Sequence, residues 1–91
     1  MLGKEFIDKK VFAAGMVMIG QVKEISVDAN NFAVTDLIVQ VEKEAARKIF
    51  GERFLMGGPQ VKVPVSIIDK LGDVVSLNFG LDQLKDHLVR S

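Results

Sequence analysis

The chain has 91 residues, no cysteine, and 12 basic against 12 acidic side chains, so its formal net charge at pH 7 is zero. The missing cysteines exclude disulfides and thiolate-bound zinc as supports for a small fold. The length allows one domain over residues 1–91, and the balanced charge excludes a whole-chain attraction to nucleic acid or to anionic membranes.

The first part of the chain has the alternation of β-strands. A first strand or pair of strands is expected within residues 5–12, and a turn follows at 12–15, where Gly15 takes a positive φ readily. Two long strands, 16–27 and 32–41, form a hairpin. Their loop is rich in Asp and Asn, which hydrogen-bond to their own backbone.

In both strands of this hairpin, the apolar residues occupy even-numbered positions at first and odd-numbered positions further along. We call this switch a parity change. Polar residues interrupt the first strand at 23–24 and the second at 35–36. Since side chains alternate across a strand, one extra residue sends the following apolar set to the opposite face. Folding the hairpin about the middle of its turn sets Val22 against Leu37 and makes the two interruptions meet. This predicts a corner at which the ribbon leaves one sheet and enters another, as in a small closed barrel. The apolar sets are Met16, Met18 and Val22, then Ile25 and Val27, and in the second strand Phe32 and Val34, then Leu37, Val39 and Val41.

The period then changes to that of a helix. Over residues 42–50, apolar side chains recur four apart, and Gly51 stands where a C-cap would. A helix this short is unstable alone in water, so it must dock its apolar edge on the rest of the fold.

The last third predicts a strand, a short turn, a strand and a helix. Residues 61–65 alternate, with Pro64 typical of an edge strand or the start of a corner. Ser66 can cap one helical turn over 67–69, and a last strand follows at 75–79. The leucine spacing of 81–88 then predicts a C-terminal amphipathic helix.

Four short segments, in this order and spacing, are informative together. They are Leu2, Gly3 and Lys4; the strand "iGxV..i.vD" from Ile19, Gly20, Gln21 and Val22 to Ile25, Val27 and Asp28; its partner, residues 37–41; and the closing "vPv..I...GDvv.L" of Val63, Pro64, Val65, Ile68, Gly72, Asp73, Val74 and Leu77. Together they resemble the PRC-barrel domain family, a small β-barrel named for the photosynthetic reaction centre. The match covers nearly the whole chain, with residues 42–60 least constrained.

The resemblance implies an all-β barrel of about six strands, with a short helix after the central hairpin and a C-terminal helix. It also implies an adaptor, because the family has no shared catalytic residues to carry over. Similar domains occur in the reaction-centre H subunit, in a ribosome-maturation factor and as stand-alone archaeal proteins, some linked to cell division. This chain is most similar in form to the stand-alone archaeal kind.

Residues with catalytic or ligand chemistry are few. His87 is the single histidine and is expected to be solvated on the last helix, because no second imidazole or thiolate can join it in a metal site. Asp69 and Asp73 are better explained by a turn cap and a tight turn than by a magnesium site or an acid and base pair. Gly57–Pro59 lacks the lysine of a phosphate loop. We therefore predict no enzyme, no catalytic residue, no metal or cofactor and no small-molecule substrate.

Surface contacts are the remaining candidates. The chain is 48% hydrophobic before its eight glycines are counted, against a usual 45–50% with glycine, which favours self-association, with a homodimer expected. The candidate interface is Phe50, Phe54, Leu55 and Met56, and the alternative is that these side chains seal one end of the barrel. A second reading, RNA contact by a ribosome-maturation or RNA-processing factor, would use Lys43, Arg47, Lys48 and Arg53.

These patterns together predict a non-enzymatic adaptor that self-associates and binds a protein partner of unknown identity. No apolar run approaches the roughly 20 residues of a membrane span, and no charged and apolar leader precedes Gly3. We therefore expect no membrane insertion and a cytoplasmic location.

Overall fold

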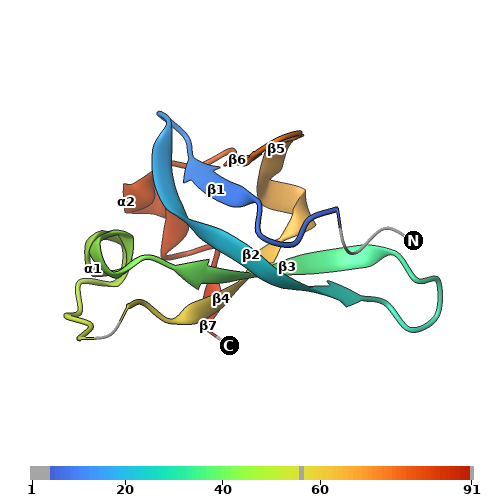
Figure 1. Cartoon of the computed structure of the whole chain (residues 1–91), viewed down its shortest axis with the longest axis horizontal. Coiled ribbons are helices and arrows are strands. Elements are labelled where there is room, and N and C mark those ends of the chain that lie inside the picture. Colours follow the sequence, from blue (N-terminus) through green and yellow to red (C-terminus); the bar gives the residue numbers. More distant parts are fainter. Residues whose placement is uncertain (1–4, 56, 91) are drawn as a thin grey trace.

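The computed structural model describes residues 5–55 and 57–90, which form a single curled sheet with two short helices at one end (Figure 1). The sheet order is β5-β6-β1-β2-β3-β4-β7; β1 and β6 run parallel, and the other neighbouring pairs in this order are antiparallel. The elements are β1 (Lys10–Ala13), β2 (Val17–Val27), β3 (Val34–Val41), α1 (Lys43–Phe50), β4 (Gln60–Pro64), the 3-10 turn η1 (Val65–Ile67), β5 (Ile68–Leu71), β6 (Val75–Leu77), α2 (Leu81–Leu84) and β7 (Val89–Arg90).

The all-β, barrel-like class is confirmed, but the details differ from the expectation. Seven strands replace about six, and within the described residues the sheet is a half-barrel whose edge strands are β5 and β7. Curling of one sheet encloses the core, so the expected passage of the ribbon between two sheets is wrong. None of the helices described is long and apolar enough to cross a membrane.

The core is built mainly from valine on the inner face of the sheet. β-branched side chains suit this position because they pack well on a pleated surface. α1 adds Ala45, Ala46 and Ile49, and α2 adds Leu84, so the two helices close one end of the half-barrel. The largest fully buried side chains are Ile19, Leu37, Leu84, Val11, Val22, Val39, Val41, Val61, Val63 and Val75.

The two parity changes in the hairpin are β-bulges. Val22 pairs with Val39 and Glu24 with Ile38, which leaves Lys23 as an extra residue in β2. A second irregularity leaves Thr35 extra in β3. Because each bulge absorbs one residue, the apolar side chains that flank it stay on the inner face instead of changing face: Val22 and Ile25 in β2, and Val34 and Leu37 in β3.

The bulges do not meet, and the predicted register is wrong by two residues, since Val22 lies opposite Val39 rather than Leu37. The cause is the turn. The hairpin was expected to fold about the middle of residues 28–31. The Asp28 amide instead donates to Ala33 O at 2.8 Å, so the centre of the turn lies one position later and the register shifts by two residues. Phe32 belongs to this loop with φ of 59°, not to the strand.

The start of the sheet also differs from the pattern. Residues 5–8 form a turn, and the first strand is β1, later than expected. Val11 pairs with Gly20 and Phe12 with Met18, so Ile19 is an extra residue in β2 and is fully buried. The expected core residues Met16 and Met18 are exposed and half-buried respectively.

The helix after the hairpin is confirmed, whereas the last third of the chain differs. Gly51 caps α1 in the left-handed region (φ 72°), and its amide donates to Arg47 O at 2.8 Å. Ser66 makes no cap bond, since η1 begins at Val65 and β5 follows it directly. The C-terminal helix ends at Leu84 because the chain beyond it turns and pairs as β7 with the outer side of β4.

Candidate functional site

Helix α1 and the chain that follows it form a shallow hollow of about 460 Å³ at one end of the molecule. We call it the α1 hollow, and its lining residues are Lys43, Glu44, Arg47, Arg53, Phe54 and Leu55. Ala45, Ala46 and Ile49 hold the buried side of α1 on the core, which turns the charged side of the helix outward. The left-handed cap at Gly51 then sends residues 52–55 back along the hollow.

The α1 hollow has an excess of positive charge. Arg47 Nη2 donates to Glu44 Oε2 at 3.2 Å, which neutralises one of its three cations. Neither Lys43 nor Arg53 forms an ion pair within residues 5–55 and 57–90. Counting only partners in the described part of the chain, the hollow therefore presents two cationic groups without an ion-pair partner.

Two phenylalanines of the predicted interface are partly covered within the chain. Phe50 and Phe54 are half-buried and pack against the core. The Arg90 guanidinium lies 4.7 Å from the centre of the Phe50 ring and 5.3 Å from that of Phe54, and it also contacts the Glu52 carboxylate. Cation–π contacts at exposed sites contribute about 0.5–1 kcal/mol each to stability, so Arg90 helps to hold β7 against both rings.

Leu55 is the member of the predicted interface that points into solvent, because 86% of its surface is exposed. It stands at the rim of the α1 hollow, directly after Phe54. Met56 lies outside the described residues. Of the three members that the structure describes, two are half-buried and one is exposed.

The four residues predicted to contact RNA do not form one strip. Lys43, Arg47 and Arg53 line the α1 hollow, whereas Lys48 lies on α1 outside it. Glu44 stands among the three, and an acidic side chain there opposes phosphate binding.

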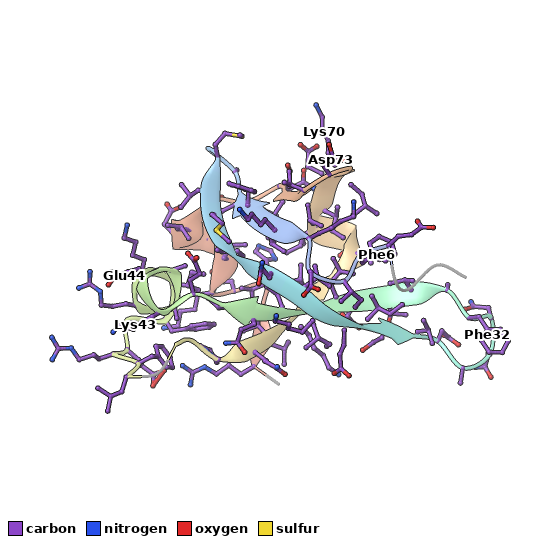
Figure 2. All side chains as sticks on the ribbon, viewed as in Figure 1. Phe6, Phe32, Lys43, Glu44, Lys70 and Asp73 are labelled. Carbon is purple, nitrogen blue, oxygen red and sulfur yellow. The ribbon has the colours of Figure 1, made fainter. Side chains whose placement is uncertain are left out.

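A second exposed feature is the hairpin tip, which we define as residues 28–33, between β2 and β3. Phe32 is 78% exposed at the far end of the molecule (Figure 2). The alternation of apolar residues predicted Phe32 inside a strand, where it would have had a cross-strand partner. The signal that could have found it is the run of Asp and Asn before it, since such a run extends the loop.

The remaining chemical candidates take structural positions. His87 is half-buried and stacks on Phe79, with ring centres 3.9 Å apart and planes 11° apart, so the expectation of a solvated histidine is wrong. Asp69 lies on β5 and caps no turn, and Asp73 is exposed in the β5–β6 turn. Across the described residues, no three His, Cys, Asp or Glu side chains gather as metal ligands would.

The glycine-rich segment 57–59 is a loop, as expected, and it packs tightly. The Gly58 amide donates to Val41 O at 3.0 Å, and Gln40 Nε2 donates to Gly58 O at 2.6 Å. A Cβ at Gly58 would lie 2.6 Å from Val41 O. This glycine is therefore needed for the close approach of the loop to β3.

No family model matches this chain, and a search of the curated proteins finds no match either. The resemblance to PRC-barrel domains stays a prediction based on the residues quoted above.

Proposed function

We propose that this chain is a non-enzymatic adaptor of the PRC-barrel kind that self-associates and binds protein partners. Its resemblance to stand-alone archaeal members suggests a role in cell division. In this proposal the fold serves as a rigid support, and the exposed ends of the molecule form the contacts.

The observation that supports this proposal best is the exposure of large apolar side chains at defined positions. Phe32 is 78% exposed and Leu55 is 86% exposed, and both lie in loops between regular elements. Among the described residues, no polar or charged side chain is buried. Exposure of a large apolar side chain to water is unfavourable, so exposed residues of this kind are typical of contact surfaces.

Self-association is tested by sedimentation velocity from about 10 µM to 1 mM protein. We expect the mean mass to rise above the 10.0 kDa of one chain as concentration increases. Leu55→Asp should weaken association without unfolding the chain, because Leu55 makes little contact with the core. Phe54 is unsuitable for this test, since its half-buried ring supports the fold. A 10 kDa species at every concentration would contradict the proposal.

RNA contact remains a second candidate, because three of the four predicted basic residues meet at the α1 hollow. The Arg90 guanidinium over Phe50 and Phe54 leaves these rings less available for stacking on bases.

If RNA is the ligand, a fluorescent single-stranded oligonucleotide should bind at low ionic strength and be released as salt rises. Two phosphate contacts, one each from Lys43 and Arg53, would give a log–log salt slope of about −1.4. The variant Arg53→Glu should abolish this binding, whereas Lys70→Glu, on an exposed edge strand away from the hollow, should leave it unchanged. Absence of binding at low salt would dismiss this candidate.

A further inference from the structure

The hairpin tip holds Phe32 outward in a rigid turn. The Phe32 amide donates to Asp28 O at 2.7 Å, and the Asp28 amide donates to Ala33 O at 2.8 Å. Two side chains add to these bonds, since Asp28 Oδ1 accepts from the Asn30 amide at 2.7 Å and Asn31 Oδ1 from the Ala33 amide at 2.9 Å. The turn is therefore preorganised, which lowers the entropy lost when it binds a partner.

Phe32 itself is an unusual residue for this position. Its φ of 59° lies in the left-handed region, where glycine and asparagine are common and a bulky side chain is uncommon. Its ring is 78% exposed, so packing within the chain does not compensate for the strain. A strained and exposed aromatic residue points to a contact outside the chain.

The α1 hollow lies at the opposite end of the molecule. The described residues extend 37 Å along their longest axis, and Figure 2 places Phe32 at one end of that axis and Lys43 and Glu44 at the other. A chain cannot place its own tip in its own hollow. A second copy can.

Tip and hollow are complementary in charge and in polarity. Asp28 is the single charged residue of the tip, whereas the hollow presents Lys43 and Arg53 without ion-pair partners in the described chain. The hollow also offers Leu55, whose exposed side chain would gain from contact with a phenyl ring. Arginine guanidinium groups pack on aromatic faces as well.

We propose that the hairpin tip of one copy docks in the α1 hollow of a second copy, with Phe32 against Leu55 and Asp28 near Arg53. This inference rests on the proposed self-association and gives its contact. The contact is head-to-tail, so each added copy still presents one open tip and one open hollow. Such contacts continue into a filament unless their rotation closes a ring.

The experiment breaks the two halves of the contact in separate chains. Phe32→Asn keeps a residue suited to the left-handed turn but removes the ring, and Arg53→Glu places a carboxylate opposite Asp28. Each variant alone should associate at least about tenfold more weakly than the natural chain, as loss of a central contact residue does. An equimolar mixture should form a discrete dimer, because one intact tip and one intact hollow remain for a single contact.

Met16→Asn is the matched control. Met16 is exposed to the same extent as Phe32 and also has a positive φ, of 66°, but it lies in the β1–β2 turn. Its replacement should leave association unchanged, and unfolding midpoints should show that all three variants stay folded.

The outcomes separate this inference from the proposed function. If the natural chain associates and Phe32→Asn associates equally well, the tip is not the contact, and self-association stands. If each variant is monomeric and their mixture is also monomeric, the tip and hollow do not bind each other. If the natural chain is monomeric throughout, both proposals fail.

Discussion

Gly20→Ala is expected to destabilise the fold by about 3 kcal/mol or more, because the new methyl group would overlap backbone. A Cβ at Gly20 would lie 2.1 Å from Gln40 O and 3.0 Å from Val41 Cα. Both atoms belong to β3, which pairs directly with β2 at this level, so neither can move without breaking the ladder. The total stability of a domain this size is about 5–14 kcal/mol, which makes this loss a large fraction.

Urea unfolding measures this effect. With a slope of about 1 kcal/mol per M, the midpoint of Gly20→Ala should fall by about 3 M. Gly72→Ala is the control, because a Cβ there meets no atom within 4 Å and the residue has no positive φ. The control should stay within about 0.5 kcal/mol of the natural chain. Equal midpoints for the two variants would show that β2 and β3 do not approach as closely at Gly20 as described.

Local structural features of this chain can be predicted well from its sequence. The parity changes in the hairpin located both bulges, at Lys23 and Thr35. The change of period located α1, and the glycine after it predicted the cap. These features depend on a few neighbouring residues, so a short pattern is sufficient to identify them.

Long-range pairing is what the sequence did not predict. β7 has two residues and exists because the outer side of β4 offers partners to Val89 and Arg90. β5 pairs with β6, the next strand along the chain, but its four residues, Ile68–Leu71, include two charged side chains and show little apolar alternation. Neither strand has a local signal strong enough to separate it from a helix or a loop.

The candidate site was predicted in part for the same reason. The cluster of large apolar residues beside a short helix predicted Leu55 as a contact residue. The same pattern could not show that Leu55 is exposed whereas Arg90, on β7, covers the Phe54 ring. The three cations of the α1 hollow come from α1 and the loop after it, so proximity in sequence brought them together. Phe32 was missed because its exposure depends on where the hairpin turn closes, and one residue of difference moves it from strand to tip.

Deleting Gln40 should unfold the chain or cost at least about 3 kcal/mol, whereas deleting Lys23, at nearly the same level of the hairpin, should cost only about 1–2 kcal/mol. Lys23 is the extra residue of a bulge, so its removal leaves Val22 and Ile25 on the inner face and removes only the local bend. Gln40 is paired on both sides, with Gln21 and Gln60. Its deletion would move Val41 to the outer face and bring Glu42 to the inner one, where a carboxylate is costly.

Two substitutions separate the backbone effect from the side-chain effect. Lys23→Ala removes an exposed ion pair with Asp8 at 3.6 Å, and Gln40→Ala removes the bond from Gln40 Nε2 to Gly58 O. We expect each to cost about 1 kcal/mol or less in thermal or urea unfolding, because neither changes the face of any core residue. If deletion of Lys23 lowers the free energy of unfolding as much as deletion of Gln40, then the fold does not tolerate loss of the bulge. In that case the bend at Lys23 is required to close the half-barrel around its core.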